Sequence, residues 1–348
     1  MQEMMEAIIK EIALTPIDVS GGEDRIETIY FGGGTPSLIK SSELSLILEA
    51  IRKKTAFAPE IEITLEANPD DLTDGTLAEW KAIGINRLSV GLQSFSDREL
   101  SWMNRVHTAD EAVQCLDIIR ENGFTNFSVD LIYGSPLLGN DEWKKNVELV
   151  IEKNIPHLSC YALTVEPKTA LHKMIGLKKK EPIDPSKQAD QFLLLMDWMK
   201  QAGYEHYEIS NFAKPGMRSR HNSSYWSGVP YFGFGPSAHS FDGHKRKWNI
   251  ANNALYLKTI EKGQIPFEEE ILTQTQKLNE YTMTALRTME GLDLEWVASN
   301  FGNRSVHKIK EMAFKWEAGE KLTIHNERVI LTNGGKLFAD GIAADLFL

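Results

Sequence analysis

Short apolar runs alternate with longer amphipathic stretches from Ile26 to about Phe212. In the longer stretches apolar residues recur at helical spacing, and several open on Ser, Thr, Asp or Asn and stop before a glycine, as helix caps require. The short runs are rich in β-branched residues and have the length of buried strands. This βα alternation predicts a parallel sheet with right-handed crossovers. Strands are expected at 26–31, 61–67, 87–93, 127–134, 158–164 and 207–213, and helices at 41–54, 72–84, 108–123, 140–154 and 186–203.

The pattern changes after about Ala213. Residues 214–265 are rich in glycine, proline and aromatic residues, have no clear period, and indicate an ordered loop region that crosses the sheet. Helical patterns then return at 275–289, 293–301 and 305–319, followed by a hairpin at 321–332 that turns at Asn326 and Glu327. We therefore predict an α/β protein in three parts: a partial barrel over 1–213, the crossing region over 214–265, and a small winged-helix-like α+β domain over 266–348.

Composition narrows the class of protein. The 348 residues carry a formal charge of −11 and a pI near 5.4, which argues against a general nucleic-acid or anionic-membrane binder. Two cysteines cannot build a disulfide framework, and they fit a reducing compartment. The start, MQEMMEAIIKEIAL, predicts an amphipathic helix and not a signal peptide, and no apolar run approaches the roughly 20 residues that span a bilayer. We expect a cytoplasmic location.

Polar or glycine residues stand where five of the predicted strands end: Gly32–Thr35, Glu66–Pro69, Gln93, Asp130 and Thr164–Pro167. The carboxyl ends of parallel strands meet at one edge of a sheet, so these residues predict a ligand site at one mouth of a curved sheet.

The chemistry of these residues suggests what they could bind. Consecutive glycines leave backbone groups open to a ligand, and Thr35 adds a hydroxyl, although a tight βα turn has the same sequence. Glu66 could bind an amine or ribose hydroxyls, or form an ordinary ion pair. Asp130 lies between Val129 and Leu131 and is costly to bury alone, so we expect a partner, from the protein or from a ligand. Arg105 is positioned to meet a carboxylate.

Two histidines stand among aromatic residues and glycines. His221 lies in HNSSYW and His239 in GFGPSAHSF. Either could ligate haem iron or line a porphyrin pocket, or could be a hydrogen-bonded structural histidine. His206 and His244 are nearby in sequence and stay open as alternatives.

Nine motifs in series resemble one family: FGGGTPS, LEANPDDL, NRLSVGLQSF, MNRVHTADEA, SVDLIYGSP, LTVEPKTAL, YEISNFAKPG, RHNSSYW and GFGPSAHSF. Together they resemble the HemW haem chaperones, which are radical-SAM proteins (SAM, S-adenosylmethionine) related to the oxygen-independent coproporphyrinogen III oxidase HemN. The resemblance covers nearly all of the chain. It implies a TIM-like partial (β/α) barrel with a C-terminal domain of the HemN type.

The resemblance also implies roles for single residues. Gly33, Gly34 and Thr35 match the family's contacts with the methionine part of SAM. The other matching SAM positions are Glu66, Gln93, Arg105 and Asp130. HNxxYW is associated with haem in the family, which makes His221 the implied haem residue.

One part of the family pattern is absent from the sequence. The family holds a [4Fe–4S] cluster with a CxxxCxxC loop that follows a first barrel strand, because thiolates are the ligands of such a cluster. Here the two cysteines, Cys115 and Cys160, are far apart, lie downstream of the glycines, and are expected to be buried core thiols. We expect an incomplete gene model that starts at an internal methionine, so that the cluster belongs to the complete protein and this chain alone does not cleave SAM.

Three functions remain open at this point. The first is a haem chaperone that binds haem at the barrel mouth and passes it to acceptor haemoproteins. Its acceptors could include membrane haemoproteins, which it would contact peripherally. The second is an oxidase that decarboxylates coproporphyrinogen III to protoporphyrinogen IX in porphyrin biosynthesis. The third is a cofactor-free interaction protein. The HNSSYW segment favours the first.

Overall fold

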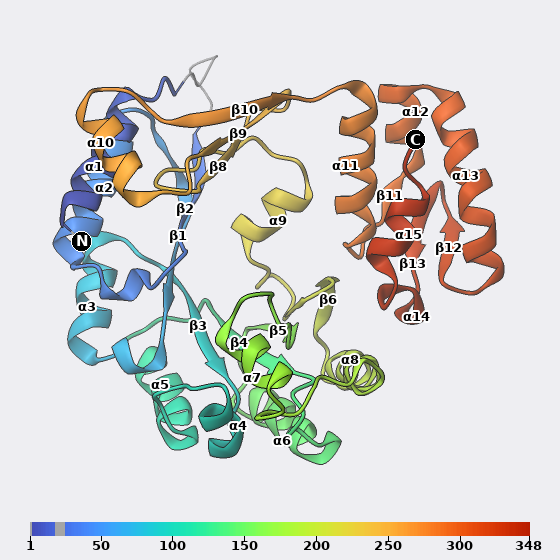
Figure 1. The fold of residues 1–348 in the computed structure, drawn as a ribbon, viewed down its shortest axis with the longest axis horizontal. Coiled ribbons are helices and arrows are strands. Elements are labelled where there is room, and N and C mark those ends of the chain that lie inside the picture. Colours follow the sequence, from blue (N-terminus) through green and yellow to red (C-terminus); the bar gives the residue numbers. More distant parts are fainter. Residues whose placement is uncertain (1, 18–24) are drawn as a thin grey trace.

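A curved seven-stranded sheet forms the centre of the structure, a computed structural model that describes residues 2–17 and 25–348 (Figure 1). Its order is β1-β2-β3-β4-β5-β7-β6. The first five strands are parallel: β1 (Ile26–Phe31), β2 (Phe57–Ala67), β3 (Arg87–Gln93), β4 (Phe127–Tyr133) and β5 (His157–Ala162). The sheet confirms the predicted α/β partial barrel.

The last predicted strand, at 207–213, is wrong in one respect. It is two short antiparallel strands, β6 (Glu205–Glu208) and β7 (Asn211–Ala213), and β7 pairs antiparallel with β5. The chain reverses at residues 209–210, where the Glu208 carboxylate accepts hydrogen bonds from the Ser210 N–H, at 3.2 Å, and from the Asn211 side chain. A side chain that bonds the backbone two residues on favours a turn over a continuous strand.

Helices cover the outer face of the sheet. They are α2 (Ser41–Arg52), α3 (Asp74–Ile83), α4 (Asp97–Trp102), α5 (Ala109–Glu121), α6 (Asn140–Glu152) and α8 (Pro185–Gln201). Threonines cap two of them, because the Thr73 and Thr108 side chains accept the N–H three residues on. The main hydrophobic core lies between these helices and the sheet, with Leu65, Trp80 and Trp143 almost fully buried.

The inner face of the sheet is polar. Side chains alternate between the two faces of a strand, so residues that flank the core residues Leu65, Leu88 and Val129 point the other way. Those inner-face residues include Thr28, Tyr30, Glu62, Thr64, Glu66, Arg87, Ser89, Ser128, Asp130, His157 and Ser159. None of these eleven residues is aliphatic, which suits a face that holds polar groups and not a second hydrophobic core.

The predicted crossing region contains regular structure that the sequence did not indicate. A helix, α9 (Arg220–Trp226), lies on the concave side of the sheet (Figure 1). A small antiparallel sheet follows, made of β8 (His239–Phe241), β9 (Lys245–Asn249) and β10 (Phe267–Ile271). Seven residues are too few for helical periodicity to be visible in a sequence, which is why α9 was not predicted.

The N-terminal helix α1 (Gln2–Leu14) holds this small sheet against the barrel. Glu11 is buried and accepts hydrogen bonds from the Gly235 N–H at 2.8 Å, the Asn249 side chain at 2.6 Å and the Tyr256 hydroxyl at 2.5 Å. Tyr256 belongs to α10 (Asn253–Glu261), which also packs on α1. One carboxylate therefore joins three segments that are distant in sequence.

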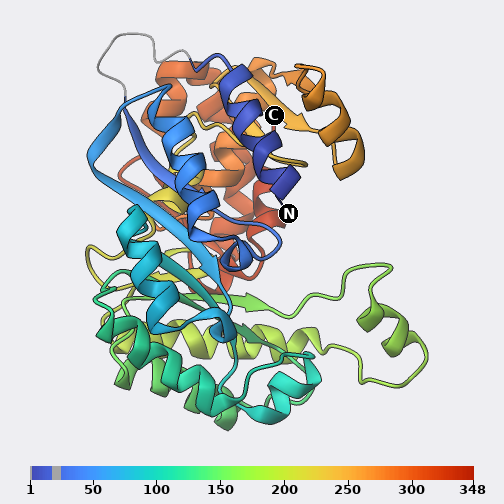
Figure 2. The same ribbon diagram turned by 90° about the vertical axis from the view of Figure 1, so that its left-hand side faces the viewer.

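A different segment stands away from the body. Residues between β5 and α8, including α7 (Ala170–Gly176), extend outward in Figure 2, and no residue of α7 is buried.

The C-terminal part has its own core. It contains α11 (Gln274–Leu286), β11 (Leu292–Asp293), α12 (Leu294–Phe301), α13 (Asn303–Ala318), β12 (Leu322–His325), β13 (Arg328–Leu331), α14 (Asn333–Lys336) and α15 (Ala339–Asp345). The hairpin turns where predicted, with φ +48° at Asn326 and +53° at Glu327, as a two-residue hairpin turn with both central residues at positive φ requires. Within the described ranges, no helix has the length and apolar character that a bilayer crossing demands.

Candidate functional site

The glycine run and Glu66 meet at the carboxyl ends of β1 and β2. The Glu66 carboxylate accepts the Gly33 N–H at 3.0 Å and the Tyr30 hydroxyl at 2.9 Å. Gly33 and Gly34 have φ of +83° and +67°, and no atom lies within 4 Å of where their side chains would begin. The loop thus has a fixed inner side and an open outer side, over which a ligand can contact the backbone.

Thr35 belongs to this loop, and Gln93 ends β3, which lies two strands from β1 in the sheet. Gln93 ends β3 in a left-handed conformation, with φ +70°, and the β3–β4 pairing shifts register between Val90 and Gln93. Such an irregularity re-aims a side chain at the edge of a sheet. Thr35 precedes the short 3₁₀ turn Pro36–Leu38, and its hydroxyl makes no capping bond.

Asp130 faces the interior of the barrel from β4. Its Oδ1 atom is buried and has no hydrogen-bond partner, although part of the residue is accessible to solvent. Burial raises the pKa of this carboxyl to about 6, and the negative charge of Glu66 acts in the same direction. Arg105 lies on the exposed loop after α4, and its positive charge acts to lower the same pKa. The carboxylates of Glu66 and Asp130 are therefore close enough to interact.

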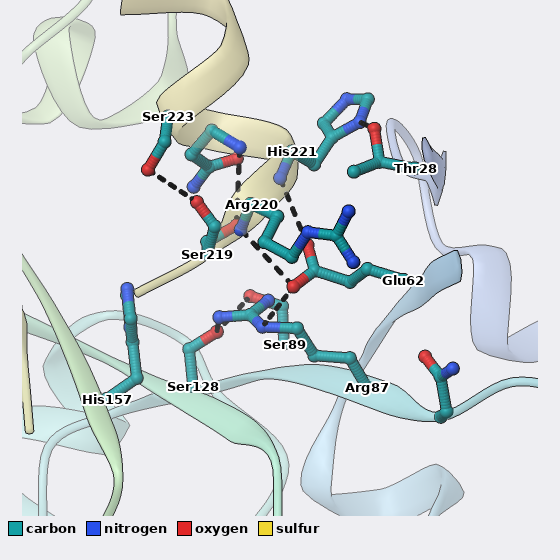
Figure 3. A network of polar contacts seen from close by, with 12 residues as sticks. Thr28, Glu62, Arg87, Ser89, Ser128, His157, Ser219, Arg220, His221 and Ser223 are labelled. Atoms are coloured by element: carbon teal, nitrogen blue, oxygen red, sulfur yellow. Dashed lines mark hydrogen bonds and ion pairs between the residues drawn. The ribbon is translucent and has the colours of Figure 1, made fainter. Parts of the chain in front are cut away.

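A second polar group lies deeper on the inner face and holds α9 (Figure 3). The Glu62 carboxylate, 4% exposed, accepts the backbone N–H of His221 at 3.0 Å and of Arg220 at 3.2 Å. Ser219 caps the same helix end through the Asn222 N–H at 3.3 Å. Because the first N–H groups of a helix have no partner within it, these contacts fix where α9 begins.

Arg87 supports Glu62 from the next strand. It is 1% exposed, its Nε lies 3.9 Å from the Glu62 carboxylate, and its Nη2 donates to Ser128 at 2.8 Å. Ser128 lies in turn 3.3 Å from the Ser89 hydroxyl. A buried arginine needs such a carboxylate partner, so Glu62 and Arg87 form one unit.

His221 projects from α9 toward β1. Its Nδ1 lies 2.8 Å from the Thr28 hydroxyl and its Nε2 lies 3.2 Å from the Tyr225 hydroxyl. Its ring stacks on the Tyr30 ring, with centroids 4.9 Å apart and planes 22° apart. Burial lowers the pKa of His221 to about 4, and the positive charge of Arg87 contributes. The imidazole is therefore neutral at neutral pH.

Tyr30 connects the two groups. Its hydroxyl donates to Glu66 while its ring contacts His221. Glu66, which is expected to bind SAM, and His221, which is expected to bind haem, therefore both contact the side chain of Tyr30.

The other histidines have different surroundings. His239 is exposed and stacks on Trp248, with ring centroids 6.2 Å apart. His206 is enclosed by Phe192 and Phe212, and burial lowers its pKa to about 3. His244 lies at the β8–β9 turn, 2.8 Å from the Lys277 ammonium.

The cysteines are core residues. Cys115 and Cys160 are free thiols, 3% and 1% exposed. Across residues 2–17 and 25–348, no three His, Cys, Asp or Glu side chains gather in a way that could hold a metal ion. These residues do not fit an iron–sulfur cluster.

Sequence reasoning missed Glu62, Arg87 and Thr28. We expected the polar residues of the site at the ends of strands, whereas these three lie within strands. The available signal was alternation: polar residues recur at every second position at 62, 64 and 66, at 87 and 89, and at 128 and 130. In strands buried on both faces, apolar residues are expected at these positions, so the alternation marks a polar inner face.

Comparison with known proteins agrees with this geometry. The profile of the Radical SAM superfamily matches residues 17–150, which include the glycine run, Glu66, Gln93, Arg105 and Asp130. The solved structure of coproporphyrinogen III oxidase (HemN) from Escherichia coli superposes with a TM-score of 0.83 over 99% of this chain and 83% of that chain. At 20% identity that likeness shows the fold alone.

Curated sequences are more similar. The Heme chaperone HemW of Bacillus subtilis is 33% identical over 98% of this chain and 88% of its own length. The protein of the same name from Mycobacterium tuberculosis is 32% identical over 92% of this chain and 80% of its own length. With this identity along almost its whole length, the chain belongs to the HemW family of radical SAM proteins.

Proposed function

We propose that this protein binds haem through His221 and passes it to acceptor haemoproteins. The observation that carries the proposal is the environment of His221. Its imidazole is neutral, its Nδ1 contacts Thr28, and its ring stacks on Tyr30. The helix that carries it is positioned by hydrogen bonds to Glu62. The name of the relatives, Heme chaperone HemW, supports the ligand and the task.

The contacts of the imidazole suit a metal ligand. A ligating histidine usually donates its second ring N–H to an acceptor, which fixes the tautomer. In the tautomer whose Nδ1–H donates to Thr28 Oγ1, the lone pair of His221 lies on Nε2, where its present neighbour is the Tyr225 hydroxyl at 3.2 Å. Tyr225 is 42% exposed, so its hydroxyl can give up Nε2 to the iron while its ring stays packed on Tyr231, 4.7 Å away.

The residues present also fit SAM. The glycine backbone is open, and among the residues that the structure describes none forms a hydrogen bond with the buried Oδ1 of Asp130. We assign Gly33, Gly34, Thr35, Glu66, Gln93, Arg105 and Asp130 to SAM, whose amine and ribose hydroxyls suit carboxylate and amide groups. SAM bound there would supply organic-radical chemistry only together with a reduced [4Fe–4S] cluster, for which the described residues offer no ligands. Glu66 would then both orient the ligand and hold Tyr30.

Hemin titration followed by absorbance tests the proposal. The wild-type protein should bind one hemin per chain, and His221→Ala should weaken binding by about tenfold or more, since an axial ligand is lost. His307→Ala is the matched control because His307 is exposed on α13. Equal binding by wild type and His221→Ala, together with loss in His239→Ala, would move the ligand to His239.

Delivery needs its own readout. Hemin-loaded protein mixed with an excess of an apo-haemoprotein should transfer hemin faster than free dissociation into buffer. Membrane haemoproteins and soluble ones are both acceptors to try, and the cytoplasm is the compartment that the composition favours. Transfer at the rate of free dissociation would leave haem binding without a chaperone role.

The oxidase alternative rests on the fold alone, at 20% identity to HemN. Anaerobic turnover of coproporphyrinogen III to protoporphyrinogen IX would establish it instead, measured with SAM and a reductant on a form of the protein to which a cluster-binding CxxxCxxC loop has been supplied.

A further inference from the structure

We infer that the haem macrocycle lies on an aromatic face formed by Tyr225, Tyr231 and Phe241, with Arg246 as the partner of a propionate. The inference rests on the proposed function, because it places the rest of the ligand whose iron is assigned to His221. We call these three aromatic residues and Arg246 the porphyrin face.

Five aromatic rings form a continuous row from the sheet to this face. Starting from Tyr30, centroid distances are 4.9 Å to His221, 5.0 Å onward to Tyr225, 4.7 Å to Tyr231 and 6.3 Å to Phe241. The row begins on β1, passes along α9 and ends on β8. It therefore leads from the iron ligand to an aromatic surface outside the sheet.

Strand pairing places the outer residues on one side. Tyr231 and Phe241 form a bridge with hydrogen bonds of 2.8 and 2.9 Å between their backbones, and Phe241 is paired with Arg246 across β8 and β9. Residues directly opposite each other in an antiparallel pair have side chains on the same face. Tyr231, Phe241 and Arg246 therefore share one face of the small sheet.

This face suits the ligand better than the inner face of the barrel. A porphyrin is a flat, largely apolar ring with two carboxylates, and aromatic surfaces favour such rings by stacking and burial. The inner face is instead polar, and it already contains buried polar atoms without partners on Thr64, Asp130 and His157. Tyr225 is 42% exposed and the neighbouring Val229 46% exposed, so the row is accessible beside α9.

Arg246 has N–H donors to spare for a propionate, beside two carboxylates that it already faces. Arg246 pairs with Glu280 at 2.5 Å, and its strand neighbour Glu270 accepts a hydrogen bond from Gln276 at 2.7 Å. A guanidinium has five N–H donors, so Arg246 can keep Glu280 and bind a second carboxylate. Lys277, beside His244, adds positive charge nearby on α11.

Metal-free protoporphyrin IX reports the contacts of the macrocycle alone, because it has no iron for His221 to bind. We expect Tyr231→Leu and Phe241→Leu to raise the Kd of both hemin and metal-free protoporphyrin IX, each by about tenfold. His221→Ala should raise the Kd of hemin alone. Fluorescence reports the metal-free ligand and absorbance the hemin.

Matched variants guard against a general loss of folding. Phe232→Leu changes an aromatic residue that is 44% exposed but stacks on Phe234, away from the row, and should bind both ligands as wild type does. Tyr231→Phe keeps the ring and should also bind normally. If Tyr231→Leu loses its native circular dichroism, Phe241→Leu decides the question.

The propionate contact has a separate test. Arg246→Gln should weaken hemin by about threefold to tenfold and leave the dimethyl ester of hemin unchanged, since the ester lacks the carboxylates. Lys245→Gln is the control, because Lys245 is the adjacent residue of β9 and pairs with Glu269 at 3.1 Å.

The outcomes distinguish the two proposals. Wild-type affinity for both porphyrins in Tyr231→Leu and Phe241→Leu, with loss of hemin in His221→Ala, would overturn the porphyrin face and leave the proposed function intact. Failure of the wild-type protein to bind hemin would overturn both. Loss of hemin and of metal-free porphyrin in the face variants alone would support the placement.

Discussion

Replacing Glu62 by glutamine tests whether the buried Glu62–Arg87 unit positions α9. The amide cannot accept both N–H groups of Arg220 and His221 as well as the carboxylate does, and it leaves the Arg87 charge unmatched. Hydrogen bonds to a charged group contribute roughly 1.5–3 kcal/mol each, and removal of one partner of a buried ion pair costs roughly 3–5 kcal/mol.

The structure sets the expected size within these ranges. The bonds of 3.0 and 3.2 Å are ordinary, while the ion-pair distance of 3.9 Å is long, so we expect about 3 kcal/mol for Glu62→Gln. Since 1.4 kcal/mol corresponds to a factor of ten, amide hydrogen exchange in α9 should accelerate by about 100-fold. Exchange measured by mass spectrometry on peptides that cover Arg220–Trp226 reports this directly.

Two comparisons make the result specific. Glu60→Gln changes an exposed carboxylate on the same strand and should leave exchange in α9 unchanged. The double variant Glu62→Leu/Arg87→Met removes both charges, so it should recover much of the global stability while exchange in α9 stays fast. Unaltered protection of α9 in Glu62→Gln would show that this carboxylate does not position the helix.

Three further outcomes are expected. The pKa of Asp130 is raised from 3.8 to about 6, so the folded state binds this proton more tightly than the unfolded state does. The folded state therefore loses up to about 3 kcal/mol of stability as pH rises from about 4 to about 6. Urea unfolding of Asp130→Asn should show a flatter pH dependence in this window and a higher free energy of unfolding near neutral pH. Gly34→Ala should lower the free energy of unfolding by roughly 1–2 kcal/mol, because φ is +67° and no atom crowds the new Cβ, whereas Gly75→Ala within α3 should raise it; equal shifts of one sign would contradict the backbone argument. Burial raises the pKa of the Cys115 thiol to about 12 and that of Cys160 well above its ordinary range, so a thiol reagent should label both only on unfolding, and rapid labelling of the native protein would show that the core opens.

The sequence predicted those parts of the fold whose signal repeats along the chain. The strand at 26–31 and the hairpin turn at Asn326 and Glu327 are where they were expected, because β-branched runs and a two-residue turn are local signals. The prediction of one strand at 207–213 was wrong because a turn that the Glu208 side chain stabilises interrupts it. The helix α9 was not predicted because seven residues are too few to show helical periodicity, and the contacts with Glu62 that fix where it begins join residues distant in sequence.

The site was predicted unevenly for the same reason. Strand-end residues such as Gly33 and Glu66 were found from topology, and the structure brings them into contact. The connection between Glu66 and His221 was not predicted, because it runs through Tyr30. Tyr30 lies on the inner face, 36 positions before Glu66 and 191 before His221. Ring contacts between residues so distant in sequence have no local pattern, and only the folded sheet shows them.

A structure of the complex with hemin would test haem binding by His221 most directly. We expect iron bound to Nε2 of His221, Nδ1 still paired with Thr28, and the porphyrin plane beside Tyr231 and Phe241. Iron bound to another side chain, or hemin seated on the polar inner face of the sheet, would contradict it.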